Sequence, residues 1–195
     1  AFYESKPIYL RPFSHTKPPF PVVDLRAETC GRCHQAIYQE WKLSTHAQAY
    51  KGDAQFMAEL HKSQKPDRDV GWMCLNCHTP LVNQLERLVV GLRDGRLDRP
   101  IYVKNPTFDR ELQKDAITCA VCHVRNGEVL GPYGNAATAP HRVRKAPELL
   151  RSELCLRCHQ ASANFPELTL ACVFNTGKEH AASDYAKKDK RTCQS

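Results

Sequence analysis

The feature that most constrains this chain is a five-residue pattern, Cys-x-x-Cys-His, which occurs four times in 195 residues. Composition alone predicts about 0.02 such motifs, so the repetition indicates a shared chemistry. Two thiols one helical turn apart can form thioether bonds to one haem, and the His that follows can ligate its iron. We therefore predict four covalent haems c, held by Cys30, Cys33 and His34; Cys74, Cys77 and His78; Cys119, Cys122 and His123; and Cys155, Cys158 and His159.

Zinc is the main alternative for these cysteines, because four-thiolate zinc sites also use Cys-x-x-Cys pairs. Two such sites would account for eight cysteines. They would not require a histidine after every second cysteine, however, so the spacing favours haem.

Haems of this number also bear on the fold class. The chain has 13 Pro, 9 Gly and a negative mean hydropathy, so an ordinary apolar core would be thin. Each haem is a large apolar plate that the chain can wrap. We expect a mostly α, loop-rich, single-domain fold in which the haems form the core. Little β structure is expected, apart from a short hairpin signalled by Asp94-Gly95.

Each iron needs a second axial ligand, and five histidines remain outside the motifs. Of the two methionines, Met57 and Met73, the second abuts Cys74 and is too close to reach over that haem. Bis-His ligation throughout would give low-spin, low-potential haems suited to electron transfer, with no open iron for a substrate. We predict these ligands to be His46, His141, His180 and His15, with His61 as the alternative to His15 or His180.

Local patterns place three of these candidates. Helical spacing of apolar and aromatic residues over 34–46 predicts one helix that ends near His46. His141 ends a Gly-, Pro- and Ala-rich loop, residues 131–141, which can approach a haem closely. His61 lies on a predicted helix over 54–64, where it could be no more than a polar edge residue. A further helix over 147–159 is expected to carry the fourth motif.

An internal echo bears on His180. Residues 179–186 parallel residues 40–47, with His180 in the place of Trp41 and Tyr185 in the place of His46. We interpret the echo as a second copy of one element, in which the ligand role has moved to His180.

The first motif followed by Trp41-x-x-Ser44-x-His46 resembles the cytochrome c-554-like multihaem family, which includes the tetrahaem cytochrome of ammonia oxidisers. Residues 74–81 and 131–141 are similar to other segments of that family, and the resemblance covers residues 28–195. It implies that His46 and His141 ligate haems other than those nearest in sequence. Residues 192–195 resemble the start of a fifth motif in longer relatives, and the sequence stops before the second Cys of that motif.

Haem attachment takes place outside the cytoplasm, so we expect export to the cell surface or beyond it, or otherwise to the periplasm. Ala1 would be the residue left after a signal peptide is removed. No apolar run approaches the roughly 20 residues of a membrane span. Cys172 and Cys193 lie outside the motifs and are predicted to form a disulfide, with two free thiols as the alternative.

Residues 1–27 form a Pro-rich, aromatic-rich arm ahead of the tetrahaem domain, residues 28–195. Such an arm could fold back on its own chain or cross to a neighbour, and His15 lies in its middle. In haem count and size the chain resembles the four-haem subunits of extracellular cytochrome filaments (OmcE type). That resemblance implies head-to-tail contacts between identical subunits, in which a His of one subunit completes a haem of the next.

The formal net charge of +7 does not indicate a nucleic-acid partner. Four bis-His haems with ionised propionates would bring it to about +3 when oxidised and about −1 when reduced. We predict an electron carrier, not an enzyme, that acts as the subunit of a conducting filament and exchanges electrons with donor and acceptor proteins or extracellular acceptors. The alternatives are a soluble periplasmic shuttle and a multihaem reductase with one open iron.

Overall fold

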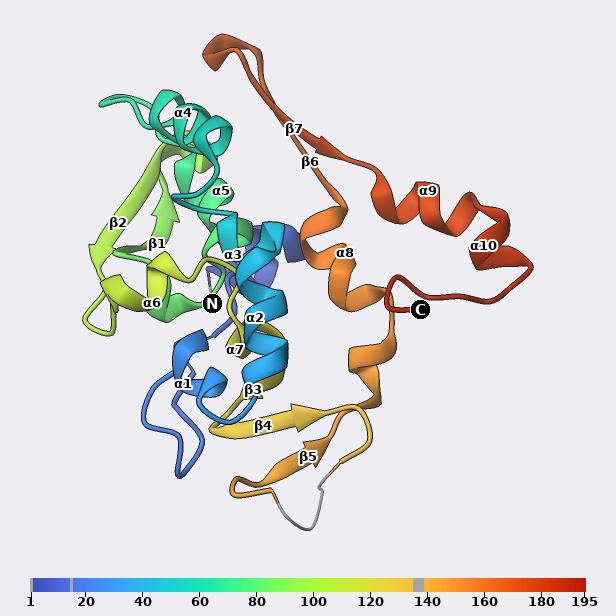
Figure 1. The fold of residues 1–195 in the computed structure, drawn as a ribbon. Coiled ribbons are helices and arrows are strands. Elements are labelled where there is room, and N and C mark those ends of the chain that lie inside the picture. Colours follow the sequence, from blue (N-terminus) through green and yellow to red (C-terminus); the bar gives the residue numbers. More distant parts are fainter. Residues whose placement is uncertain (1, 15, 135–138) are drawn as a thin grey trace.

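The computed structural model describes residues 2–14, 16–134 and 139–195 (Figure 1). Its helices are short and are spread along the whole chain. They are α1 (Ala27–Gly31), α2 (Gln35–Leu43), α3 (Thr45–Gln48), α4 (Ala54–Ser63), α5 (Gly71–His78), α6 (Arg110–Lys114), α7 (Cys119–His123), α8 (Glu153–His159), α9 (Thr176–Ala182) and α10 (Asp184–Lys187). No helix of the described ranges is long and apolar enough to cross a bilayer.

The expectation of a mostly α fold with little β structure is wrong. The described residues form three separate small sheets, which lie between the helices. They are the antiparallel pair β1 (Arg87–Leu92) and β2 (Pro100–Lys104), the mixed sheet β3 (Val124–Arg125), β4 (Glu128–Gly131) and β5 (Val143–Lys145), and the antiparallel pair β6 (Ala161–Phe165) and β7 (Leu170–Phe174). The β1–β2 hairpin is the predicted one, because Asp94 and Gly95 both adopt positive φ at its turn.

Two strands begin directly after the third and fourth motifs, and for this reason the β content expected from the sequence was too low. β3 begins at the residue after His123, and β6 begins two residues after His159. The helices α7 and α8 each end at the histidine of their motif. The chain then continues in an extended form that has no period-2 pattern long enough to be recognised.

Two predicted helices are also interrupted. Residues 34–46 do not form one helix, because Ser44 is extended (φ −77°, ψ 154°) and its Oγ accepts a hydrogen bond from Ala47 N (3.2 Å) to begin α3. Residues 147–159 are divided between a 3₁₀ turn, Pro147–Leu150, and α8. The helix predicted over 54–64 is confirmed as α4, with Phe56 and Leu60 buried.

The N-terminal arm folds back on its own chain over the described residues. Leu10 and Phe13 are buried, and the Phe13 main chain forms two hydrogen bonds with the segment after the second motif. Phe13 N donates to Pro80 O (2.7 Å) and Val82 N donates to Phe13 O (2.9 Å). Further on, Thr16 N donates to the side chain of Asn83 (3.1 Å). The arm is therefore a strap over the domain and not a free extension.

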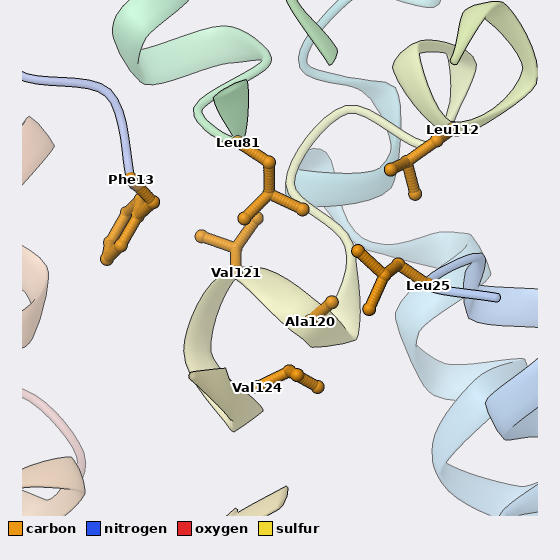
Figure 2. Close-up of a cluster of buried hydrophobic side chains, with 7 residues drawn as sticks. All are labelled: Phe13, Leu25, Leu81, Leu112, Ala120, Val121 and Val124. Atoms are coloured by element: carbon orange, nitrogen blue, oxygen red, sulfur yellow. The ribbon is translucent and has the colours of Figure 1, made fainter. Parts of the chain in front are cut away.

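The apolar core is divided into three small clusters. The first surrounds α7, where Ala120 and Val121 of the third motif face Leu81 and Leu25 (Figure 2). The second packs arm residues such as Leu10 against Val70, Trp72 and Met73 at the start of α5 and against Leu170 of β7; the third is Leu130, Ala146 and Leu149. In α7, Ala120 and Val121 are buried in the first cluster and Cys122 packs against it, whereas none of the residues of α8 is buried.

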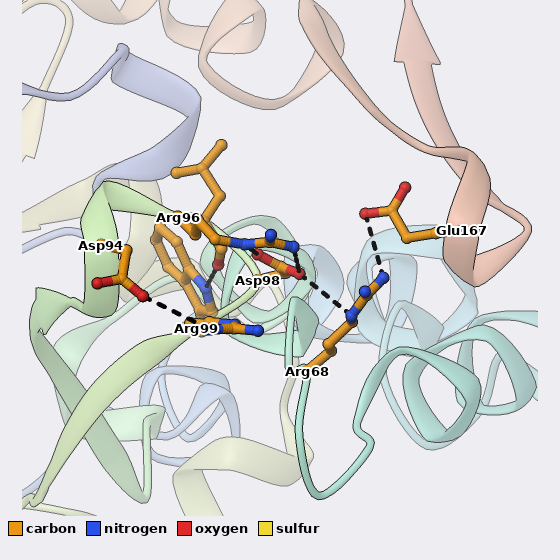
Figure 3. A network of polar contacts seen from close by, with 8 residues as sticks. Arg68, Asp94, Arg96, Asp98, Arg99 and Glu167 are labelled. Atoms are coloured by element: carbon orange, nitrogen blue, oxygen red, sulfur yellow. Dashed lines mark hydrogen bonds and ion pairs between the residues drawn. The ribbon is translucent and has the colours of Figure 1, made fainter.

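The β6–β7 hairpin reaches from α8 towards α4 (Figure 1) and is fixed there by ion pairs. Arg68 pairs with Glu167 of the hairpin (3.8 Å) and with Asp98 (3.7 Å), and Arg96 pairs with Asp98 (2.7 Å; Figure 3). The side chain of Asp98 is only 5% exposed, and its hydrogen bonds to Arg96 lower its pKa. Lys62 of α4 also donates to Thr169 O (2.7 Å).

Replacing Asp98 by Asn should lower the free energy of unfolding by about 1.5–3 kcal/mol, the usual value for hydrogen bonds to a charged group. The pKa of folded Asp98 lies below that of the unfolded chain, about 3.9, so the stabilisation is complete above that pH. It is lost as the pH falls through the folded pKa. Denaturant unfolding at several pH values measures both effects.

The matched control is Asp94→Asn, since the Asp94 side chain is 77% exposed and its pair with Arg99 is long (3.5 Å). This variant should lose less than about 0.5 kcal/mol. Equal losses for the two variants would contradict the role given to Asp98.

Candidate functional site: histidine pairs and motif contacts

A tryptophan anchor positions His46. Trp41 Nε1 donates to Ile117 O (2.9 Å), and Ile117 N donates to the main-chain oxygen of His46 (3.2 Å). Ile117 lies two residues before the third motif, so these bonds attach α2 and α3 to that motif. Asp115, in the same segment, accepts a hydrogen bond from Ala27 N at the start of α1 (2.8 Å). The Trp-x-x-Ser-x-His pattern thus has three parts. The tryptophan attaches the segment to the third motif, the serine separates two helices, and the histidine provides the imidazole.

Two pairs of histidine rings face each other across long stretches of sequence. The ring centroids of His46 and His159 are 6.3 Å apart, with an interplanar angle of 53°. Those of His34 and His141 are also 6.3 Å apart, at 44°. Each pair combines the histidine of a motif with one of the predicted distal ligands. In neither pair is the partner the one nearest in sequence.

The separation fits two imidazoles that share one iron. With metal–nitrogen bonds of about 2.0–2.1 Å on opposite sides of an ion, imidazole centroids lie roughly 6–6.5 Å apart. Among the described residues, the buried Nδ1 of His141 has no hydrogen-bond partner. Burial, and then the nearby His159, lower the pKa of His46, which favours the neutral imidazole that binds metal.

The other two motif histidines are oriented by main-chain carbonyls. Nδ1 of His78 hydrogen-bonds Ala49 O, and Nδ1 of His123 hydrogen-bonds Leu130 O (2.9 Å). A proton held on Nδ1 leaves the Nε2 lone pair for a metal. The ring of Phe56 stacks on His78 at 3.6 Å, and burial lowers the His78 pKa. The described ring contacts give neither histidine a partner like those of His34 and His159.

His180 and His61 differ in their surroundings. Nε2 of His180 is buried without a hydrogen-bond partner, and its ring lies edge-on to Tyr185 at 6.2 Å. His61 is exposed on α4. His15, the fourth predicted distal ligand, lies outside the described residues.

The sequence echo corresponds to a structural repeat. Ser183 is extended (φ −70°, ψ 156°), accepts from Ala186 N (3.2 Å) and donates to His180 O (2.6 Å). Ser44 has the same conformation, accepts from Ala47 N (3.2 Å) and donates to Trp41 O (2.7 Å). His180 therefore occupies the position that Trp41 has in the first copy. The position equivalent to His46 lies on the next helix, α10, and is occupied by Tyr185.

Cysteines of different motifs contact each other. The contact between the Cys30 and Cys119 thiols raises the pKa of Cys30 and lowers that of Cys119 to about 7. The contact between Cys77 and Cys158 likewise raises the pKa of Cys77 and lowers that of Cys158. Burial, with a smaller contribution from Cys158, raises the pKa of Cys122. The first motif thus adjoins the third, and the fourth adjoins both the second and the third.

The predicted Cys172–Cys193 disulfide is not formed, and both thiols are free. Cys172 in β7 lies near the second motif: burial, and then Cys172, raise the pKa of Cys74 to about 12. Cys193 lies beside the fourth motif: burial, and then Cys193, raise the pKa of Cys155 to about 11. Cys193 N also donates to Ser152 Oγ (3.1 Å). The two leftover cysteines thus border different motifs, which their spacing in the sequence did not reveal.

The zinc alternative is not what the structure shows. Among residues 2–14, 16–134 and 139–195, no three His, Cys, Asp or Glu side chains come together as a metal site. Two pairs of motif cysteines contact each other, Cys30 with Cys119 and Cys77 with Cys158, and the rings that face each other are histidines.

Two residues inside the motifs hold the N-terminal arm and were missed in the sequence. Nδ2 of Asn76, in the second motif, donates to Leu10 O (2.7 Å). The Arg157 guanidinium, in the fourth motif, donates to Arg11 O (2.7 Å) and Pro12 O (3.2 Å). Their acceptors are main-chain oxygens, which have no signature in the sequence, so only the structure identifies these contacts.

Comparison with known proteins supports a c-type cytochrome. Residues 29–94 match the family model described as cytochrome c554 and c-prime. Comparison with curated proteins and with solved structures gave no match. The matched stretch contains the first two motifs together with Trp41, Ser44 and His46. A cytochrome c family domain implies covalent haem c and suggests electron transfer by a carrier rather than an enzyme.

Replacing His46 by Ala should remove the partner of His159 and convert one haem from low-spin to high-spin, because a six-coordinate iron loses an axial ligand. Low-temperature EPR of the ferric protein should show a new high-spin signal. His61→Ala is the matched control, because His61 is exposed, and should leave the spectrum unchanged. An unaltered low-spin spectrum in His46→Ala would contradict the pairing.

Proposed function

We propose that this chain transfers electrons through four covalent bis-His haems c. The observation that carries the proposal is the facing of His34 with His141 and of His46 with His159 at 6.3 Å. A haem iron cycles between ferric and ferrous states without binding a substrate when both axial positions are filled. The chain provides the thioether cysteines, orients the motif histidines through carbonyls such as Leu130 O, and closes each pair from a distant segment.

The contacts between motifs support an order for the electron path. Cys30 lies against Cys119, Cys122 lies near Cys158, and Cys158 lies against Cys77. We therefore propose the order first, third, fourth, second. The first and second sites are the ends of this path, where electrons would enter and leave.

We further propose that copies of the chain assemble head to tail into an extracellular filament. Neither His78 nor His123 faces a second histidine ring among the described residues, and the buried Nε2 of His180 is one candidate to complete one of these sites. His15 of a neighbouring copy is the proposed ligand of the other, with His61 as the internal alternative. Because the arm is fastened at Phe13 and Thr16, the neighbour would have to approach the arm where it lies on the domain.

The soluble periplasmic shuttle is the second candidate function. The observation that favours it is the packing of the N-terminal arm on its own chain. Leu10 and Phe13 are buried in the apolar clusters of one chain, so the arm needs no second copy to cover them. Electron microscopy of native material separates the two functions.

Four haems should add about 2.5 kDa to the 22.1 kDa chain, at roughly 0.6 kDa each. A pyridine haemochrome assay together with intact mass measures the load. Replacing Cys77 should weaken attachment of the second haem and leave three, whereas Cys193→Ala should leave all four. A mature wild-type chain with three haems or fewer would refute the count.

Replacing His15 by Ala in the native host should give folded tetrahaem monomers with one altered haem and no filaments, because the ligand supplied to the neighbour is lost. Negative-stain microscopy and EPR measure the two effects. His61→Ala should leave filaments intact. Filaments of normal length with four unperturbed low-spin haems in His15→Ala would rule out the assembly.

A further inference from the structure

A cluster of two arginines and one phenylalanine lies where the N-terminal arm meets the third and fourth motifs. The guanidinium carbons of Arg125 and Arg157 are 4.0 and 3.8 Å from the ring centroid of Phe13. Arg157 is part of the fourth motif, and Arg125 follows His123 by two residues. The cluster therefore brings two positive charges to the junction of two haem-attachment sites.

No acidic side chain of the described residues compensates these charges. The ion pairs of the described residues include neither Arg125 nor Arg157. Both donate only to main-chain oxygens: those of Ala120, Val121 and Val124 for Arg125, and those of Arg11 and Pro12 for Arg157. Nε of Arg157 is buried and has no hydrogen-bond partner.

An arrangement of this kind is costly without an anion. Like charges over one ring repel each other, and a buried guanidinium N–H without an acceptor forfeits its hydrogen bond to water. A carboxylate is the natural partner, because the planar guanidinium offers a fork of N–H groups that matches its two oxygens. No protein carboxylate takes that place within the described part of the chain.

We propose that Arg125 and Arg157 bind a propionate carboxylate of one of the haems whose motifs adjoin here, and that they raise the reduction potential of that haem. The inference rests on the proposed function, since it requires haems at these motifs. Two guanidinium groups around one carboxylate leave a net positive charge, and this charge stabilises the ferrous state, which has one more electron. The Phe13 ring holds both guanidinium groups in place, so the arm contributes to the setting of the potential.

The test is Arg157→Gln in the fully matured protein. Arg32→Gln is the matched control, because Arg32 occupies the same position in the first motif and is exposed. Spectroelectrochemical titration measures each midpoint potential. In Arg157→Gln, we expect the equilibrium constant for reduction of one haem to fall about tenfold, which is about 59 mV for one electron. In Arg32→Gln, every potential should stay at its wild-type value.

Two further variants keep the proposal falsifiable. Arg125→Gln lies outside the motifs and should shift the same haem in the same direction, even if Arg157→Gln fails to mature. Arg157→Lys retains the charge but not the fork, so the potential should return part of the way to wild type. Unshifted potentials in Arg125→Gln, or a shift in Arg157→Gln no larger than in Arg32→Gln, would overturn the proposal. Haem loading, measured on the same samples, tests the proposed function separately.

Discussion

The proposed function places one constraint on the whole structure, which is that the two thiols and the imidazole of each motif must reach the same haem. This constraint limits the surface of each motif helix that is left for packing against the rest of the chain. In α7 the packed face is Ala120 and Val121, and in α5 it begins with Trp72 and Met73. The apolar core of the described residues is divided into three clusters. Hydrogen bonds from side chains to main-chain oxygens, such as those of Trp41, Asn76 and Arg157, connect segments that are distant in the sequence.

The four motifs and the residues that would hold haem were identified from the sequence, because they are residue types at fixed spacing, and their chemistry stays a prediction. The four motifs need only local geometry, and the resemblance around Trp41 and His46 implied ligation across distant segments. The structure places His46 opposite His159 and His141 opposite His34, as that implication requires. The echo at residues 179–186 likewise corresponds to a second helix–serine–helix element.

The remainder depended on contacts without a local signature. Residues 34–46 are mostly helical, as their spacing predicts, but they form two helices. The Ser44 side chain caps the second helix, and the periodicity of apolar residues does not reveal such an interruption. Strands that follow directly from a motif, such as β3 and β6, are too short to show alternation. Cys172 and Cys193 seemed a natural pair by elimination, yet their positions are set by β7 and by the Ser152 contact.

The two histidine pairs have a consequence for how the protein must be made. The span from His34 to His141 overlaps the span from His46 to His159, and each covers more than half of the chain. A polypeptide that emerges from a translocon with its N-terminus first would expose the earliest attachment site long before His141 arrives. Under the proposed function, the order of synthesis and the order of coordination therefore conflict, because the first haem would have His34 as its axial ligand before His141 is made.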